Sequence, residues 1–216
     1  MNLENLKTVE IFGNRTIGIC QNLYSKNISN SIIDIRYVSG KIDKLQEDSL
    51  NCLPQIEILM ITKTNLMTIQ VGVFNLLNNL KYINLSCNKL TTIPMNLFDN
   101  LKNLAVILLN NNEIKNIQDK TFTLPGIESI KLLNLSHNEI NIKSDTFDGV
   151  KCDQLDLSYN KISHIENNAF EDTNIKQLYL HNNFEISVIN PAWRIPKFTI
   201  VQMYEDYVVE FYPSRG

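Results

Sequence analysis

Two pairs of side chains in this sequence have the residue types that chemistry requires. Cys87 and His137 could supply a nucleophile and its general base, and Asp156 and His181 could supply two metal ligands. In the repeat frame described below, Cys87 and His137 fall two strands apart, roughly 9–10 Å, which is beyond hydrogen-bond reach. No third ligand joins Asp156 and His181. We therefore expect no enzyme, no metal site and no cofactor.

Composition excludes further classes of function. The chain has only 7 glycines and no Gly-rich phosphate loop. Its net charge is −3, from 20 basic and 23 acidic residues, and no Lys/Arg cluster gives the electrostatic footprint of a nucleic-acid-binding protein. No apolar run approaches the roughly 18 residues of a membrane span. We expect no nucleic-acid partner and no membrane span in this segment.

A repeat of about 24 residues determines where every other residue lies. Its clearest copy is LKYINLSCNKLTTIPMNLFDNLKNL, residues 80–104. Apolar residues occupy positions 1, 4 and 6 of this copy, and Asn88 occupies position 9. The spacing is typical of a short strand, a bend and an irregular return arc. Position 1 recurs near residues 6, 32, 56, 80, 104, 130, 152, 175 and 198.

The polar ninth position explains how the turns would be held together. A buried amide can donate and accept hydrogen bonds at once, so it can bond the backbone of its own turn and of an adjacent turn. We expect a weaker or water-filled ladder at Gly40 and Thr64, which depart from the pattern. The column reads Asn14, Gly40, Thr64, Asn88, Asn112, Asn138, Asn160, Asn183 and Asp206.

These motifs resemble the 24-residue leucine-rich repeat of animal extracellular and receptor-ectodomain proteins. NLSHNEI (134–140) and LDLSYNKI (155–162) are similar to its most typical wording. The resemblance implies an α/β repeat solenoid, a right-handed coil with a parallel β-sheet on its concave face and mostly irregular or short-helical convex arcs. It also implies a protein-binding role.

The organisation expected from this frame is a single solenoid, 1–216, of about nine repeats. Leu3 already occupies position 22 of a preceding turn, and the ninth turn, with Phe198 and Val208 inward, stops near Tyr212. Because a solenoid needs polar capping ends, both ends look truncated. We therefore interpret the chain as part of a longer protein.

The cysteines and the glycosylation sequons bear on the compartment. Cys152 occupies an inward position, whereas Cys20 and Cys52 lie on adjacent return arcs, where a bridge is possible but not required. Their disulfide state stays open. Three sequons are candidate glycosylation sites. Asn27 lies in the first arc, whereas Asn84 and Asn134 lie at outward strand positions. The repeat consensus itself contains the letters NLS, so the sequons at Asn84 and Asn134 are equally well explained by the fold. The sites are Asn27, Asn84 and Asn134.

Outward positions 2, 3, 5, 7 and 8 should form the concave surface. In the N-terminal half they carry an ordinary mixture of residues. In the C-terminal half, neighbouring turns place His137 beside Tyr159, Asp156 beside Tyr179 and His181 beside Tyr204. Aromatic side chains are common energetic anchors of interfaces, although Tyr is also a favourable residue on any strand surface. The candidate protein-binding residues are His137, Asp156, Tyr159, Tyr179, His181 and Tyr204.

Two classes of function are compatible with this surface. The first is a non-enzymatic, secreted or cell-surface recognition module that binds a protein ligand or co-receptor, as in families that serve adhesion or innate immunity. The second is an intracellular scaffold or regulatory subunit built on the same coil. Phe98 and Pro94 in the return arc, together with the sequons, favour the extracellular class.

Overall fold

The structure is a computed structural model, and it describes residues 7–12, 19–20, 31–184, 186–205 and 207–210. The first repeat mark at Leu6, the ladder positions Asn14 and Asp206, and the sequon at Asn27 lie outside these residues. Within the described part, no helix is both long and apolar enough to cross a bilayer.

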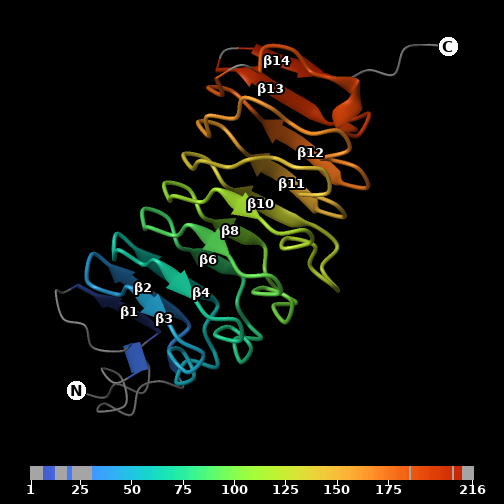
Figure 1. Cartoon of the computed structure of the whole chain (residues 1–216). Coiled ribbons are helices and arrows are strands. Elements are labelled where there is room, and N and C mark those ends of the chain that lie inside the picture. The colour runs from blue at the N-terminus through green and yellow to red at the C-terminus, as the bar shows by residue number, and fades with distance from the viewer. Residues whose placement is uncertain (1–6, 13–18, 21–30, 185, 206, 211–216) are drawn as a thin grey trace.

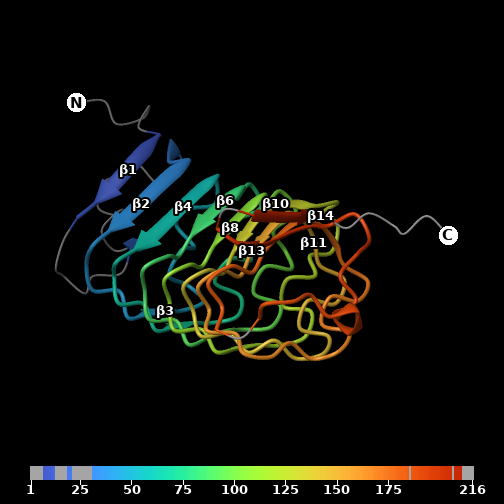
Figure 2. The same cartoon turned by 90° about the horizontal axis from the view of Figure 1, so that it is seen from above.

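One long sheet runs the length of the molecule, with the return arcs on its opposite face (Figures 1 and 2). Neighbouring strands are parallel from β1 to β13, and only the last pair is antiparallel. The order is β1 (Thr8–Ile11), β2 (Asp34–Val38), β4 (Ile58–Thr62), β6 (Tyr82–Asn84), β8 (Val106–Leu108), β10 (Ile130–Asn134), β11 (Lys151–Asp156), β12 (Asn174–Tyr179), β13 (Ile200–Tyr204) and β14 (Tyr207–Glu210).

The register of this sheet is the one that the repeat predicts. Position 4 of each turn pairs with position 4 of the next, so that one file of apolar side chains runs beneath the whole sheet. All but Val9, which is partly buried, are at most 1% exposed. The file is Val9, Ile35, Leu59, Ile83, Ile107, Leu133, Leu155, Leu178 and Val201.

The return arcs contain little regular structure. Short paired strands, β3 (Lys44–Leu45) with β5 (Thr68–Ile69) and β7 (Thr92–Ile93) with β9 (Asn116–Ile117), alternate with turns. Helical structure in the described part is limited to short pieces such as the 3-10 helix η2 (Pro191–Trp193). The fold is therefore a right-handed solenoid with a parallel sheet on its concave face and almost no helix.

Stacked aromatic rings fill the space between sheet and arcs. Phe74, Phe98 and Phe122 lie parallel in consecutive turns, with ring centroids 6.1 and 5.9 Å apart. Phe147 and Phe170 continue the column at 5.5 Å. All five rings are at most 1% exposed, so each turn buries one large apolar group against its neighbour.

The asparagine ladder has the bonding that a buried amide requires. Asn138 Nδ2 donates to the carbonyl oxygens of Leu135 (3.0 Å) and Ser136 (3.1 Å) in its own turn and of Leu109 (3.1 Å) in the preceding turn. Its Oδ1 accepts from the Ile114 N–H at 3.0 Å. The same pattern, with small variations, recurs at Asn88, Asn112, Asn160 and Asn183.

The ladder is thinner at Thr64, as expected, because the Thr64 side chain makes one hydrogen bond among the described residues where Asn138 makes four. Thr64 is fully buried, and both its hydroxyl (2.9 Å) and its N–H (3.0 Å) donate to Asn88 Oδ1. The hydroxyl bonds only the following turn, whereas the amide of Asn138 donates to its own and to the preceding turn. Gly40 has no side chain, and there the turns are joined by main-chain bonds such as Ile42 N–H to Thr64 O at 3.1 Å.

The C-terminal end departs from the predicted frame. Phe198, predicted to point inward, is 80% exposed, whereas Thr199 is buried and its hydroxyl donates to the Ile175 carbonyl at 2.7 Å. The turn closed by the Thr199 N–H and the Pro196 carbonyl shifts the inward position by one residue. Beyond β13 the chain reverses, and β14 pairs antiparallel with it, so the predicted continuation of a ninth turn through Val208 was wrong.

The structure resolves the question that the sequence left open about cysteines. Cys20 and Cys52 form a disulfide between adjacent arcs, with Cα atoms 5.6 Å apart. Cys87 and Cys152 are free thiols. Cys152 is fully buried in its inward position, and burial raises the pKa of its thiol to about 12, so it is not a nucleophile at neutral pH.

Candidate functional site

The residues predicted for the binding surface come together in part as an aromatic cluster. The rings of His137 and Tyr159 stack in parallel with centroids 4.3 Å apart. The His181 ring stands edge-on to Tyr159 (5.6 Å) and to Tyr179 (6.3 Å). These four residues, called the Tyr/His cluster below, span β10 to β12 and the bends that follow them. The side chains offer a surface of aromatic rings that contact one another.

The backbone places two members of this cluster at the rim of the sheet. Position 8 has a left-handed conformation in turn after turn, with φ of 52° at His137 and 55° at Tyr159. The main-chain N–H groups of these residues donate to the carbonyl of position 7 in the next turn, Ser158 (3.0 Å) and His181 (3.1 Å). The bend therefore fixes where both rings stand.

Two polar residues that the sequence analysis did not select complete the cluster. Glu205 accepts hydrogen bonds from the Tyr159 hydroxyl and from Asn182 Nδ2, the latter at 2.6 Å. The bond from Tyr159, then that from Asn182, lowers the pKa of Glu205, and the same contact raises the pKa of Tyr159. Asn182 and Glu205 share position 8 with Tyr159, so a reading along that column would have found them.

Asp156 has a local role that explains its residue type. It is the register partner of Tyr179, as predicted, but its Oδ1 accepts from the N–H (3.0 Å) and hydroxyl (2.6 Å) of Ser158. Asn134 bonds Ser136 in the same manner. The side chain at position 5 therefore accepts a hydrogen bond from the main-chain N–H at position 7, as in an Asx-turn. This bond caps the end of the strand.

This cap also bears on the glycosylation candidates. Asn84 was expected to be exposed, but it is only 8% exposed, and its Oδ1 accepts from the Ser86 N–H at 2.9 Å. It lies between its register partners Met60 and Leu108 on the neighbouring strands. The expectation of an exposed Asn84 was therefore wrong. Asn134 is partly buried, and its glycosylation stays a prediction.

Tyr204 is half-exposed on β13, and its hydroxyl donates to the Ser187 carbonyl at 3.1 Å rather than to a member of the cluster. Among the described residues, the Nδ1 atom of its predicted neighbour, His181, is buried and has no hydrogen-bond partner. Tyr204 therefore borders the Tyr/His cluster without adding a ring contact to it.

A second patch, which the sequence analysis had described as an ordinary mixture, occupies the middle of the concave face. It is formed by half-buried apolar side chains at positions 3 and 5 of four neighbouring strands, β4, β6, β8 and β10. A comparison of positions 3 and 5 between neighbouring turns of the sequence would have revealed this patch. This central apolar patch consists of Ile58, Met60, Tyr82, Val106, Leu108 and Leu132.

Charges on the same face are largely paired with one another. Lys81 Nζ lies 2.9 Å from Glu57, Lys176 Nζ lies 2.7 Å from Asp153, and Arg36 bonds Asp34 at 2.8 Å. Within the described ranges, no three His, Cys, Asp or Glu side chains converge to hold a metal ion. The face therefore offers apolar and aromatic contact area between paired charges.

The repeats define the class of protein. The chain belongs to the leucine-rich repeat family: residues 54–114 match the family described as Leucine rich repeat, and residues 107–191 match the BspA type Leucine rich repeat region (6 copies). No curated protein matches the sequence.

Solved structures give two particular likenesses. The chain is similar to the Toll–Spatzle complex from Drosophila, with a TM-score of 0.71 and 20% identity over 91% of this chain and 27% of that chain. It is also similar to the TLR13–ssRNA13 complex, with a TM-score of 0.59 and 19% identity over 93% of this chain and 36% of that chain. The chain thus spans about a quarter to a third of these proteins, and at such identities the likeness is one of fold.

Proposed function

We propose that this chain is a non-enzymatic recognition module that binds a protein partner through its concave sheet. The observation that carries the proposal is the surface of apolar and aromatic side chains formed by the central apolar patch together with the Tyr/His cluster. Both patches include residues of β10 or the bend after it, so one partner could cover both. Soluble proteins seldom leave contiguous apolar area uncovered unless it binds something.

The residue types on this surface suit a protein interface. Interface cores are depleted in charge and enriched in aromatic residues and methionine. The rings of the Tyr/His cluster are already held by one another and by Glu205, so little side-chain entropy is lost when a partner packs on them. Leu108 and Leu132 supply apolar area beside them.

Nucleic acid is the alternative partner, because one similar structure is a TLR13–ssRNA13 complex. Binding to a phosphate backbone requires unpaired cationic side chains. Here Lys81, Lys176 and Arg36 are each held by a carboxylate on the same face. The charge pattern therefore favours a protein over RNA.

The Cys20–Cys52 bridge supports an extracellular or otherwise lumenal location over the intracellular scaffold. Disulfides persist in oxidising compartments and are rare in the cytosol. Expression of the complete transcript in eukaryotic cells, followed by thiol titration and glycosidase treatment, tests this part. Within this segment we expect two titratable thiols after unfolding, Cys87 and Cys152, identified by alkylation and peptide mapping. Four free thiols and no glycosidase shift would instead indicate the intracellular alternative.

The binding surface is tested by screening the intact chain against a panel of purified secreted and cell-surface proteins, with a single-stranded oligouridine RNA as a separate arm. For a protein that binds saturably, Leu108→Glu and Tyr159→Ala should each weaken binding by about tenfold or more, since both remove interface anchors. No RNA binding is expected even at low salt, where phosphate contacts are strongest.

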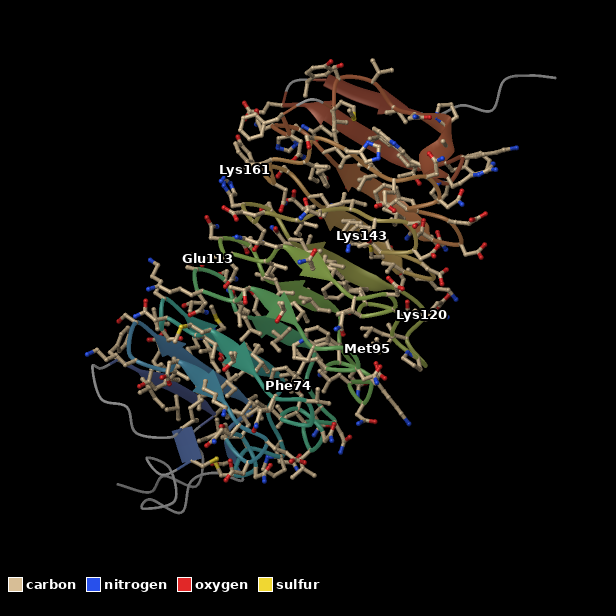
Figure 3. All side chains as sticks on the ribbon, viewed as in Figure 1. Phe74, Met95, Glu113, Lys120, Lys143 and Lys161 are labelled. Carbon is tan, nitrogen blue, oxygen red and sulfur yellow. A yellow bond between two sulfur atoms is a disulfide. The ribbon has the colours of Figure 1, made fainter. Side chains whose placement is uncertain are left out.

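The control is Met95→Glu, an equally drastic change at an exposed residue of a return arc (Figure 3). It should leave both binding and the thermal melt unchanged. Binding that survives both concave substitutions but is lost in the Met95 variant would contradict the proposal, as would RNA binding that the concave variants abolish.

A further inference from the structure

A buried aliphatic residue closes most return arcs just before the next strand begins. Its main-chain N–H bonds the carbonyl three residues earlier, at 2.9–3.0 Å, and its side chain is at most 1% exposed. These closing residues form a column parallel to the phenylalanines: Leu53, Leu77, Leu101 and Val150.

The fifth arc breaks this column for an identifiable reason. The residue three places after Phe122 is Pro125, which has no N–H to donate to the Phe122 carbonyl. The chain instead continues through Gly126, at φ +83°, and closes later, with the Ile127 N–H bonding Leu124 O at 3.3 Å. Ile127 consequently stays partly exposed instead of filling the closing position.

The long arc also lies next to a short one. The interval from Leu104 to Ile130 is 26 residues, and that from Ile130 to Cys152 is 22. The Thr123 hydroxyl donates to the Asp148 carbonyl at 2.6 Å and ties the two arcs together. The mismatch leaves a recess of about 220 Å³ between them. Its lining includes Phe122, Leu124, Pro125, Ile127, Ile130 and Lys151.

One cationic side chain among these lining residues has no counter-ion. The carboxylates nearest to Lys151 in sequence belong to other lysines: Asp148 lies 3.9 Å from Lys120, and Asp153 lies 2.7 Å from Lys176. In the part of the chain that the structure describes, Lys151 forms no ion pair. A recess of mixed polar and apolar lining, with the exposed Lys151 among its residues, therefore lies at this edge of the solenoid.

We propose that this recess binds a small arylalkyl carboxylate, with its ring among the apolar side chains and its carboxylate on Lys151. An apolar cavity of about 150 Å³ is large enough to hold benzene, so the volume of the recess suits one aromatic ring. The site lies in the return arcs, whereas the proposed protein surface is the concave sheet, so the two can succeed or fail independently.

The test is a titration of the ¹⁵N-labelled intact chain with 3-phenylpropionate, followed by amide chemical shifts. Saturable shifts confined to residues 122–130 and 149–151 are expected, with a Kd on the order of 1 mM for a ligand of this size. The neutral analogue 3-phenylpropan-1-ol should bind at the same place. Lys151→Gln should weaken the binding of the carboxylate by about fivefold, since an exposed ion pair contributes that much at most. The affinity for the alcohol should not change.

Filling the recess should abolish binding. Deletion of Pro125 and Gly126 converts Phe122-Thr-Leu-Pro-Gly-Ile127 into the three-residue spacing that Phe98 and Leu101 have, and it brings Ile127 to the closing position. Ile127→Phe fills the same space without a change of chain length, and it decides the outcome if the deletion variant does not fold. Met95→Phe, on a neighbouring arc, is the control and should bind as the parent does.

Two results would overturn the proposal. One is the absence of saturable shifts in the parent chain. The other is binding that persists in the variants that fill the recess, or shifts centred on the concave strands instead of the fifth arc.

Discussion

The two edges of the coil tolerate variation very differently. At the bend edge, from Thr64 to Asn183, each turn places a side chain at position 9 that bonds its neighbours, and the spacing within the strand and bend hardly changes. At the arc edge, successive intervals change from 26 to 22 residues around Ile130. One edge is nearly invariant within this chain, and the other varies.

The difference follows from the forces at each edge. The bend is held by hydrogen bonds, which need a donor and an acceptor within about 3 Å and in line, and a shift of one residue removes all of them. The arc is held by apolar burial, which is not directional and accepts any chain path that covers Phe74, Phe98 and their equivalents. New surface features such as the recess can therefore arise at the arc edge at little cost in stability.

Breaking the ladder should have the largest effect. Asn138→Ala removes four hydrogen bonds and leaves the carbonyls of Leu109 and Leu135 buried without that donor. We expect a loss of about 3–5 kcal/mol in the free energy of unfolding, measured by urea denaturation. The control Asn141→Ala, an exposed residue of the same turn, should change it by less than about 0.5 kcal/mol. Equal losses in the two variants would refute the special status of the bend edge.

Removing the disulfide comes next. The Cys20–Cys52 bridge closes a segment with a sequence separation of 32 at the arc edge. Replacing both cysteines by serine should lower the free energy of unfolding by about 2–4 kcal/mol, because the unfolded chain gains conformational freedom. Cys87→Ser, at a thiol that is already free, serves as the control and should have little effect. No change on removal of the bridge would mean that the arc edge needs no covalent support.

Deletions at the two edges should change the free energy of unfolding in opposite directions. Deletion of Pro125 and Gly126 should raise the free energy of unfolding by about 1 kcal/mol, as Ile127 becomes buried. Deletion of the single residue His137 at the bend edge should be destabilising, because it moves Asn138 out of register. Thermal and urea unfolding of both variants measures the contrast. A destabilised Pro125–Gly126 deletion would show that the arc edge is more constrained than its lengths suggest.

The smallest effect concerns a single exposed contact. The pKa of Glu205 is lowered by the bonds from Tyr159 and Asn182, so its contribution to stability is present at neutral pH and is lost as the pH falls through the folded-state pKa. Tyr159→Phe should move the pKa of Glu205 back up toward the ordinary value of a glutamate, as followed by carbon NMR. The pKa of Glu166, which is lowered by the hydrogen bonds from Ser144, should be the same in both proteins. An unchanged Glu205 pKa would mean that the contact is not maintained in solution.

Much of this fold could be predicted from the sequence because repetition averages out local ambiguity. One repeated pattern predicts the apolar column that runs from Val9 to Val201 across the sheet. It also predicts the hydrogen bonds of the asparagine column, which runs from Asn88 to Asn183. The candidate site was predicted less well. The sequence analysis placed His137 beside Tyr159, but it predicted neither the stacking of their rings nor Glu205 nor the central apolar patch. These were missed because equal positions of neighbouring turns were not compared throughout.

The sequence by itself determined the coil, its parallel sheet and its asparagine column, since periodic burial and hydrogen bonding leave a single arrangement that satisfies every turn. Only the tertiary structure decided the pairing of Cys20 with Cys52, the exposure of Phe198, the reversal of the chain into β14 and the recess beside Ile127. Each of these depends on one break in the pattern. At such a break no repeated constraint operates, and the outcome depends on which atoms of neighbouring turns lie within reach.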